Sequence, residues 1–387
     1  MNIGVIGLGT VGYGVIEILN NEKKRLENAI NQEINIKYGC SLDVVELPKG
    51  TIYTSDYNVV LNDESVDVIV ELIGGTTIAR EIVLKALQSK KHVVTANKAL
   101  LAKYGQEIFT QASKSGVHIF YEASVGGGIP VMVSQKESLI ANNTTEILGI
   151  LNGTTNFILT LMENDHLEFE EALKIATDLG YVEANPSLDL DGHDAANKIC
   201  LLAMNGFETY VDIDQIKTTG ITSITKDDIE FTKELGYRIK LIGQAKKVAG
   251  GLGIEVFPTI IPYSDLISHV NDAYNVVEID SDYLDNVIYY GKGAGRYVTA
   301  SAVVSDIIKT KQKTLWHYEG YQSDTKIFPI QVAAYYVRSN QVINLPYHTY
   351  INKGEQHIYI FDEIDRDILL EQLKGASYTI CKARLHK

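Results

Sequence analysis

Apolar residues occur in blocks of two lengths along the first 121 residues of the chain. Blocks with the length of a strand alternate with longer blocks in which apolar residues recur at helical spacing, as in residues 79–89 and 106–115. The short blocks predict strands at residues 1–6, 34–42, 66–73, 92–96 and 117–121. Strands that alternate with helices predict a doubly wound parallel sheet of the α/β class.

The pattern changes after about residue 130, where strands and helices no longer alternate regularly. Strands are predicted at residues 144–152, 239–247 and 255–261, and helices at residues 156–162, 169–179, 194–204 and 298–308. Thr154 or Thr155 is expected to cap the helix at 156–162. We therefore expect three regions, listed here by their bounds: an α/β domain at 1–130 that includes residues 291–311, an α+β substrate domain at 131–290, and a small α+β region at 313–387.

The first predicted strand runs into a glycine-rich loop and then a helix. The spacing Gly7-x-Gly9-x-x-Gly12 in this context is typical of a dinucleotide-binding site. Gly7 permits the tight turn, Gly9 lets the backbone approach a pyrophosphate, and Gly12 lets the helix pack closely on the strand. The alternative is a glycine-rich turn in another kind of α/β protein.

Two more strand ends carry distinctive residues, Gly74-Gly75-Thr76 and Asn97-Lys98. Ligands of doubly wound sheets lie beyond the carboxyl ends of the strands. We therefore expect these residues and the glycine loop to meet in one crevice, which would hold a nicotinamide or flavin cofactor.

Composition and charge narrow the possible partners. The net charge of −14 over 387 residues argues against nucleic acid as a main partner, because phosphate binding needs a basic surface. No apolar stretch approaches the roughly 18 residues needed to span a bilayer, so we expect no membrane contact. The cysteines Cys40, Cys200 and Cys381 have no zinc-site spacing and are typical of reduced thiols in a cytoplasmic protein.

Four segments together resemble the homoserine dehydrogenase family: residues 7–12 (GLGTVG), 95–100 (TANKAL), 121–130 (YEASVGGGIP) and 180–198 (GYVEANPSLDLDGHDAANK). Residues 151–156 and 291–295 add to a resemblance that covers about residues 1–310. It implies reversible NAD(P)H-dependent hydride transfer between aspartate 4-semialdehyde and L-homoserine. That reaction serves threonine, methionine and isoleucine biosynthesis.

The segment before the helix at 194–204 is dense in carboxylates, which suit the α-ammonium group of an amino acid: Glu183, Asp189, Asp191 and Asp194. Lys198 lies four residues after Asp194, so both side chains project from one helix face. The plainer alternative is an exposed ion pair. The resemblance implies that Lys198 transfers a proton at the substrate oxygen, that Glu183 and Asp194 bind the substrate, and that Asp189 supports the site.

Lys98 follows a strand that ends at the expected crevice. The resemblance implies that Lys98 contacts cofactor and substrate and shares in catalysis, whereas the alternative is a surface lysine that starts a helix. The resemblance also implies cofactor contacts beyond the three loop glycines: Thr10, Val11, Thr76, Gly180 and Gly295.

The sequence leaves the choice between NADP and NAD open. A carboxylate about 20 residues past the glycine loop selects the ribose 2′-hydroxyl of NAD, and an arginine there accepts the 2′-phosphate of NADP. Many family members carry arginine at the end of the second strand, whereas this chain has Cys40-Ser41 followed by Asp43. This departure argues against a strong NADP preference.

A glycine-rich loop after the strand at 117–121 matches a monovalent-cation site of the family. The resemblance implies a sodium ion held by Glu122 and by backbone oxygens of Val125, Gly127 and Ile129. The alternative is a hinge loop that holds no metal.

Residues 313–387 lie outside the region that resembles the catalytic core. Predicted strands at 330–338, 348–361 and 378–384 and a helix at 365–373 resemble a βαββαβ regulatory domain of the ACT type that lacks its first helix. We expect a truncated form that serves packing or assembly and gives no threonine feedback. The resemblance further implies a homodimer or homotetramer, formed through the domain at 131–290.

Two other functions are considered: a catalytically silent NAD-binding regulator, and another amino-acid dehydrogenase on the same scaffold. The joint presence of Lys98, Glu183, Asp194 and Lys198 argues against the silent regulator. The identity of the substrate rests on the resemblance alone.

Overall fold

The computed structural model describes residues 1–182, 185–311, 316, 318 and 320–385. The N-terminal strands form a parallel sheet in the order β3-β2-β1-β4-β5-β6, which confirms the predicted doubly wound fold. The strands are β1 (Asn2–Ile6), β2 (Asn35–Cys40), β3 (Ile52–Thr54), β4 (Val68–Glu71), β5 (His92–Thr95) and β6 (Ile119–Phe120). The strand order reverses between β1 and β4, the position at which such sheets bind ligands.

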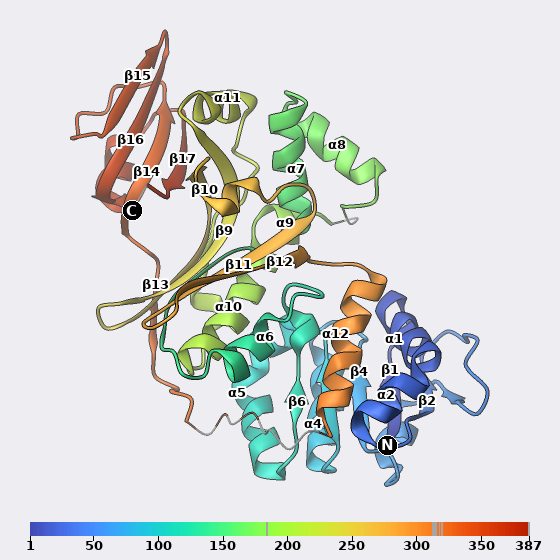
Figure 1. The fold of residues 1–387 in the computed structure, drawn as a ribbon. Helices are drawn as coiled ribbons and strands as arrows, with labels where there is room; N and C mark the ends of the chain where they lie inside the picture. The colour runs from blue at the N-terminus through green and yellow to red at the C-terminus, as the bar shows by residue number, and fades with distance from the viewer. Residues whose placement is uncertain (183–184, 312–315, 317, 319, 386–387) are drawn as a thin grey trace.

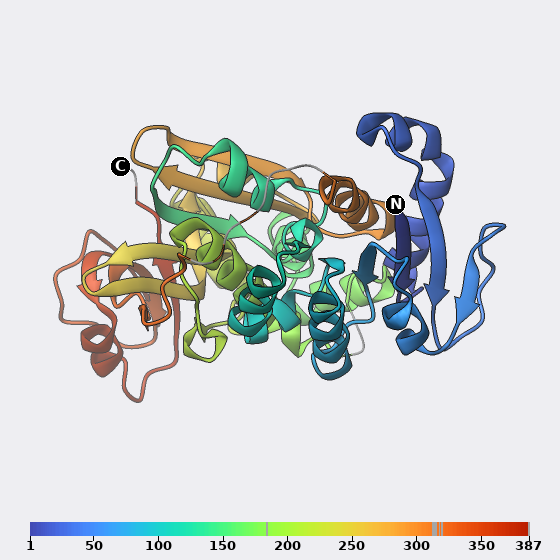
Figure 2. The same cartoon turned by 90° about the horizontal axis from the view of Figure 1, so that it is seen from below.

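Helices follow the strands of this sheet: α1 (Thr10–Asn21), α2 (Lys23–Ile30), α3 (Tyr57–Asn62), α4 (Thr77–Gln88) and α5 (Lys98–Ser115). A sixth helix, α12 (Arg296–Lys309), comes from much later in the chain and lies beside α1 (Figures 1 and 2). The Arg296 guanidinium pairs with Glu17 of α1 at 2.6 Å, and the backbone N–H of Glu122 donates to the Asp306 carboxylate at 2.8 Å. The N-terminal α/β region is therefore built from two separate stretches of sequence.

The second sheet contains eleven strands, and the N-terminal sheet and the C-terminal strands lie toward opposite ends of the molecule (Figure 1). Its main order is β12-β11-β7-β9-β10-β17-β14-β16-β15, with β8 and β13 paired to β10. Its strands from the middle of the chain are β7 (Thr144–Ile150), β8 (Lys217–Thr218), β9 (Tyr237–Val248), β10 (Gly251–Pro262), β11 (Tyr274–Ser281) and β12 (Asp285–Lys292).

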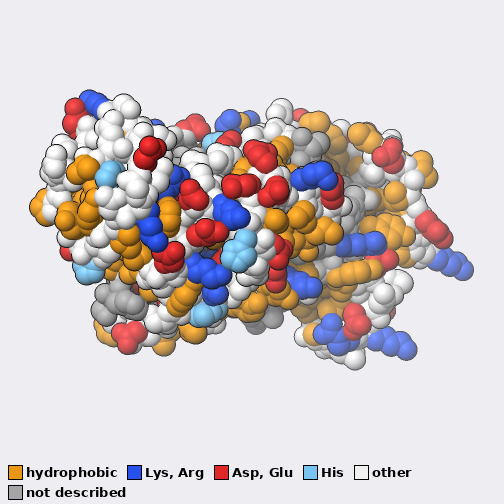
Figure 3. Space-filling view, turned by 90° about the horizontal axis from the view of Figure 1, so that it is seen from above, with side chains coloured by type: hydrophobic (Ala, Val, Ile, Leu, Met, Phe, Trp, Pro, Cys, Tyr) orange, Lys and Arg blue, Asp and Glu red, His pale blue; other side chains and the backbone are white. Residues whose placement is uncertain are grey.

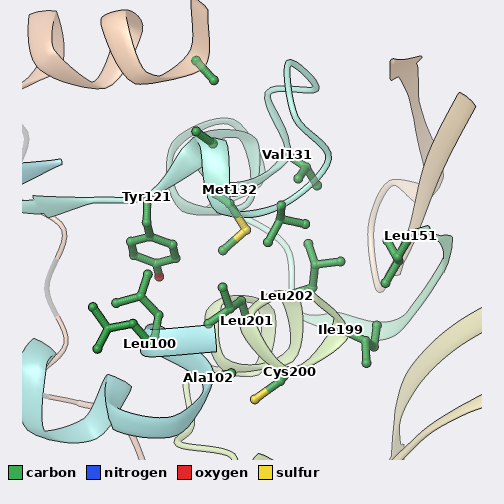
Figure 4. Packing of buried hydrophobic residues seen from close by; sticks show 14 of the residues in the cluster. Leu100, Ala102, Tyr121, Val131, Met132, Leu151, Ile199, Cys200, Leu201 and Leu202 are labelled. Atoms are coloured by element: carbon green, nitrogen blue, oxygen red, sulfur yellow. The ribbon is translucent and has the colours of Figure 1, made fainter. Parts of the chain in front are cut away.

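The helices of this region are α6 (Val131–Val133), α7 (Gly153–Asn164), α8 (Phe169–Asp178), α9 (Ser187–Leu190), α10 (His193–Phe207) and α11 (Lys226–Glu234). Short 3-10 or π turns occur at Glu122–Ser124, Ser134–Ser138, Ile213–Gln215 and Leu266–His269. Helix α10 is buried along most of its length and packs against both the second sheet and α5. Figure 4 shows Leu201 of α10 near Leu100 of α5, and Ile199 near Leu151 at the end of β7. This packing fixes the position of Asp194 and Lys198, the buried polar residues near the start of α10.

The C-terminal elements extend the second sheet rather than forming a sheet of their own. They are β13 (Lys326–Phe328), β14 (Val332–Ser339), β15 (Thr349–Lys353), β16 (Gln356–Asp365), α13 (Arg366–Gln372) and β17 (Tyr378–Ala383). Strand β17 pairs in parallel with β10, and residues 340–348 between β14 and β15 contain no helix.

Two expectations about local structure are wrong. Neither Thr154 nor Thr155 caps α7, because Asn152 does so by accepting the Thr155 N–H on Oδ1 at 2.8 Å. The segment at 348–361 is two strands rather than one, since Gly354 takes a left-handed φ of 69° and turns the chain. No element was predicted for the charged segment after α1, which forms helix α2.

Within the described ranges, no helix is long and apolar enough to cross a membrane. Figure 3 shows acidic and basic side chains interspersed across the middle of the face seen from above, so neither sign of charge forms a continuous patch on that face.

Candidate active site

Lys198 and Asp194 form the centre of the candidate site. They lie four residues apart on α10, and the Lys198 ammonium contacts Asp194 Oδ2 at 2.7 Å. The same ammonium donates to the backbone carbonyl of Leu151 at 2.7 Å, and Lys198 is only 8% exposed. The pair is therefore a buried one, unlike the exposed ion pair that its spacing also allowed.

Lys98 brings the cofactor-binding sheet into contact with this pair. It is the first residue of α5, where Asn97 caps the helix by accepting the Leu100 N–H. The Lys98 ammonium lies 3.1 Å from Asp194 Oδ1, and its side chain is 39% exposed. The Asp194 carboxylate thus pairs with two lysines, the buried Lys198 of α10 and the more accessible Lys98 at the start of α5.

Asn152 links two carboxylates of this site, those of Asp189 and Asp194. It was not among the site residues expected from the sequence. Its Nδ2 donates to Asp189 Oδ1 at 2.6 Å and to Asp194 Oδ2 at 2.9 Å. An asparagine just before a helix is a common N-cap, so the sequence carried a signal for the cap. The contact with two carboxylates depends on α9 and α10 folding back onto α7, which no local pattern shows.

Burial and charge act on the titratable groups of the site in different directions. Burial lowers the pKa of Lys198, although the Asp194 carboxylate acts to raise it. Burial acts to raise the pKa of Asp194, but the positive charges of Lys198 and Lys98 outweigh it and hold that pKa below its usual value. The site therefore keeps Asp194 ionised and lowers the pKa of the Lys198 ammonium toward neutral pH.

The other expected substrate residues are Asp189 and Glu183. Asp189 lies on α9, half-buried, with its carboxylate hydrogen-bonded to Asn152. Glu183 lies outside the described residues.

The glycine loop lies where the expected cofactor would bind. Gly7 has a φ of 99°, and a Cβ there would meet the Leu72 backbone at 2.5 Å, while a Cβ at Gly12 would meet the Gly7 carbonyl oxygen at 1.9 Å. A Cβ at Gly9, the N-cap of α1, would meet nothing within 4 Å, so its backbone faces open space. Thr10 and Val11 begin α1, and Thr76 is the N-cap of α4. These positions fit a pyrophosphate at the start of α1.

Two more expected cofactor contacts have clear local roles. Gly180 follows the C-cap of α8 with a φ of 78°, and the next N–H, that of Tyr181, donates to the Ala176 carbonyl. This is the hydrogen bond of a Schellman helix end. Gly295 is the N-cap of α12.

The expected cation ligands lie in a buried loop that packs against α12. Both Glu122 carboxylate oxygens accept backbone N–H groups, from Met132 at 2.9 Å and Val133 at 2.8 Å. Burial raises the pKa of Glu122 to about 7. The Ile129 carbonyl accepts the Val131 N–H at 2.8 Å, and Val125 and Gly127 are buried.

A second carboxyl group lies next to this loop. Asp306 of α12 is buried and accepts the Glu122 N–H on Oδ2, while its Oδ1 has no hydrogen-bond partner. Among the residues whose positions are given, no group of three or more His, Cys, Asp or Glu side chains could hold a metal ion. Any cation here would therefore depend mainly on backbone oxygens.

Comparison with known proteins gives a consistent result. Residues 7–122 match the family model described as "Homoserine dehydrogenase, NAD binding domain", and residues 130–308 match that of "Homoserine dehydrogenase". A homoserine dehydrogenase of Bacillus subtilis (strain 168) is 42% identical over 313 residues, which is 80% of this chain and 72% of that protein.

Two solved structures extend the comparison. A homoserine dehydrogenase from Thiobacillus denitrificans has a TM-score of 0.92 at 33% identity, covering 99% of this chain and 98% of its own. A hyperthermophilic archaeal homoserine dehydrogenase in complex with NADPH has a TM-score of 0.69 at 26% identity, covering 81% of this chain and 98% of its own.

Proposed function

Because the chain belongs to the homoserine dehydrogenase family of oxidoreductases, we propose that Lys198 moves the proton at the substrate oxygen during the reaction. The observation that carries this assignment is the buried Lys198 ammonium, held between Asp194 and the Leu151 carbonyl. When homoserine is oxidised, its hydroxyl proton passes to the Lys198 amine. When the aldehyde is reduced, the Lys198 ammonium returns that proton to the new alkoxide oxygen.

Asp194, Asp189 and Glu183 are proposed to hold the amino-acid end of the substrate. Asp194 is fixed by two lysines and by Asn152, and the half-buried Asp189 binds the same Asn152 amide. The α-ammonium group of homoserine would meet a carboxylate-rich surface there, and Lys98 would neutralise excess charge at the mouth of the site.

The cofactor supplies the hydride acceptor or donor, and the glycine loop with Thr10, Val11 and Thr76 is proposed to hold its pyrophosphate. Gly180 and Gly295 are proposed to lie near it. We propose that NAD is preferred over NADP. Strand β2 ends at Cys40, whose carbonyl accepts the Gly7 N–H at 2.9 Å, so the next residues lie beside the glycine loop. Those residues include an exposed Leu42 (90%) and the acidic Asp43, and residues 38–48 contain no arginine or lysine to receive a 2′-phosphate.

A monovalent cation, sodium by resemblance, is proposed at the loop of Glu122, Val125, Gly127 and Ile129. The fit rests on two adjacent buried carboxyl groups, Glu122 and Asp306, one of which has an oxygen without a donor. Backbone carbonyl oxygens of the loop would supply most of the ligands. A cation there would offset the buried negative charge and hold the loop against α12.

The metabolic pathway, the cellular compartment and the oligomeric state are proposed from the resemblance to the family. The product would enter threonine, methionine and isoleucine biosynthesis, and the enzyme would act in the cytoplasm as a homodimer or homotetramer. The comparisons do not favour a silent regulator or a different amino-acid dehydrogenase.

The test is homoserine-dependent reduction of NAD and of NADP, measured side by side in sodium and then in potassium buffer. Lys198→Met should lower turnover at least about 100-fold, the usual scale for a lost acid–base group, with little change in cofactor affinity. Lys91→Met is the matched control, because Lys91 is also buried but donates only to the carbonyls of Asp63 and Val66. Full turnover in Lys198→Met would refute the proton-transfer role.

A further inference from the structure

Asn152 has all of its side-chain hydrogen-bonding groups engaged. Its Oδ1 accepts the N–H of Thr155 at 2.8 Å and the Thr155 hydroxyl at 3.0 Å. Its Nδ2 donates to Asp189 at 2.6 Å and to Asp194 at 2.9 Å. The amide orientation follows from these partners, because a flipped amide would place its oxygen against two carboxylates and its NH₂ against a backbone N–H.

The helix cap therefore determines where the amide donors point. Asn152 is 4% exposed and lies at the junction of β7 and α7, directly after the carbonyl of Leu151 that receives Lys198. Two consecutive residues thus hold both members of the ion pair: Leu151 holds the Lys198 ammonium and Asn152 holds the Asp194 carboxylate.

The two donors to Asp194 act on the same oxygen. Oδ2 accepts both from Asn152 Nδ2 and from Lys198 Nζ, so the amide takes part of the negative charge that would otherwise face the lysine. The second N–H links Asp189 to the same amide, which offsets the repulsion between the two carboxylates.

We propose that Asn152 is a positioning residue that fixes the separation of Asp189 and Asp194 and weakens the hold of Asp194 on Lys198. This inference rests on the proposed proton-transfer role of Lys198. Without the amide donors, Asp194 would bind the Lys198 ammonium more strongly, and the lysine would release its proton only at higher pH.

Two substitutions separate this role from the helix cap. Asn152→Ser and Asn152→Asp both keep a side-chain oxygen that can cap α7, but neither keeps the two N–H donors. The measurement is the pH profile of kcat/KM for homoserine oxidation. This profile reports the pKa values of the essential acid and base groups in the free enzyme. We expect its rising limb to move to higher pH in Asn152→Ser, and further in Asn152→Asp because a third carboxylate is added.

A shift of one pH unit lowers kcat/KM about tenfold on the acid side of that limb. The matched control is Asp56→Ser. It exchanges one capping side chain for another at the N-terminus of α3, a helix that contributes no residue to the candidate site. It should leave the pH profile in place. Thermal unfolding of every variant reports the contribution of the cap.

The outcomes are distinct. An upward shift in the order wild type, Asn152→Ser, Asn152→Asp supports the inference. An unshifted profile overturns it, whether or not the melting temperature falls, because a cap alone would lower stability without moving the limb. If Asn152→Ser does not fold, Asn152→Asp decides by the same criterion.

Lys198→Met is measured in parallel. Retained turnover there would refute the proposed function and the inference together. Lost turnover with an unshifted Asn152→Asp profile would refute only the role of Asn152.

Discussion

Lys198 lies in a part of the protein where burial and pairing act on its charge in opposite directions. Burial lowers its pKa, and Asp194 at 2.7 Å acts to raise it. Asn152 reduces the effect of Asp194, and Lys98 adds a second positive charge on the other carboxylate oxygen. The result is a lysine able to change its protonation state during the reaction, which an exposed lysine would do only at strongly alkaline pH.

The first prediction concerns pH. Below the lowered pKa of Lys198 its side chain is an ammonium, and above that pKa it is an amine. Homoserine oxidation needs the amine, so its kcat/KM should rise with pH, whereas aldehyde reduction needs the ammonium and should fall over the same range. Lys198→Arg keeps the charge but cannot release the proton, so homoserine oxidation should be lost at every pH measured. Parallel pH dependence in the two directions would contradict this role.

The second prediction concerns Lys240, a buried lysine outside the site. Lys240 is 1% exposed, and its ammonium donates to the Val270 carbonyl at 2.6 Å and to the side chains of Asn156 and Asn271. Burial lowers its pKa from 10.5 to about 8. Between about pH 8 and pH 10.5, Lys240 therefore binds more protons in the unfolded chain than in the folded one. Its contribution to the free energy of unfolding consequently rises with pH over this range.

Lys240→Met removes this dependence. Relative to wild type, the variant should lose a further 1–2 kcal/mol or so between about pH 8 and 9.5. Urea unfolding at the two pH values measures the difference, in which the other titrating groups cancel. A loss of stability that is equal at both values would show that the pKa of Lys240 is not lowered.

At the level of residues, the sequence identified those site residues that belong to a short motif of neighbouring positions. Lys98, Lys198, Asp189 and Asp194 were named from spacing and resemblance, and the structure brings all four together. Asn152 was missed because its importance lies in contacts with residues 37 and 42 positions later. Such contacts follow from how helices pack, which a single sequence does not display.

At the scale of elements, the C-terminal strands are tied to the catalytic region by a buried ion pair. The Arg338 guanidinium of β14 binds Asp228 of α11 through Nε at 2.7 Å and Nη2 at 2.9 Å. Asp228 is fully buried and also accepts from Tyr336 and Thr379. The same two regions share an exposed pair, Lys353 with Glu234 at 3.0 Å.

The third prediction compares these two pairs. Arg338→Leu leaves the Asp228 carboxylate buried without its cation, which should lower the free energy of unfolding by about 3 kcal/mol or more. Lys353→Leu breaks the exposed pair that joins β15 to the same helix, α11, and should change stability little, because solvent screens that pair. Chemical denaturation of both variants gives the comparison. Equal effects would show that the Arg338–Asp228 pair does not hold these elements together.

Elements were predictable where apolar periodicity is strong and uninterrupted. Strands β1, β2, β4, β5 and β6 and helices α8, α10 and α12 lie within a few residues of the expected ranges, whereas the short strand β3 was not predicted. The hairpin of β11 and β12 was not predicted, and its outer strand is largely half-buried or exposed, so its sequence lacks a clear apolar pattern. Helix α2 buries only Leu26, which explains why periodicity did not reveal it.

At the scale of the whole molecule, the proposed division into regions at 1–130 with 291–311, at 131–290 and at 313–387 stays a prediction from the sequence. The structure shows how closely the last region is joined to the second one. Strands β14 to β17 follow the order β17-β14-β16-β15 with a single helix, α13, and β17 pairs directly with β10 of the catalytic part.

The fourth prediction is that threonine does not regulate this enzyme. Residues 340–348, where the resemblance to a regulatory domain would place a first helix, contain none. Threonine at millimolar concentration should therefore leave homoserine oxidation unchanged, measured at subsaturating substrate. Inhibition of about tenfold, well within the range of allosteric effectors, would show that the C-terminal region still binds a regulator.

The position of α12 has a consequence for how the protein is made. A ribosome completes β1 to β6 early, but the helix that lies beside α1 and accepts the Glu122 N–H emerges only with residues 296–309. Domains at the start of a chain usually fold first during synthesis. Here the cofactor-binding half must wait for most of the substrate half, so a chain released early would expose the apolar face of α1 and would have no finished cofactor site.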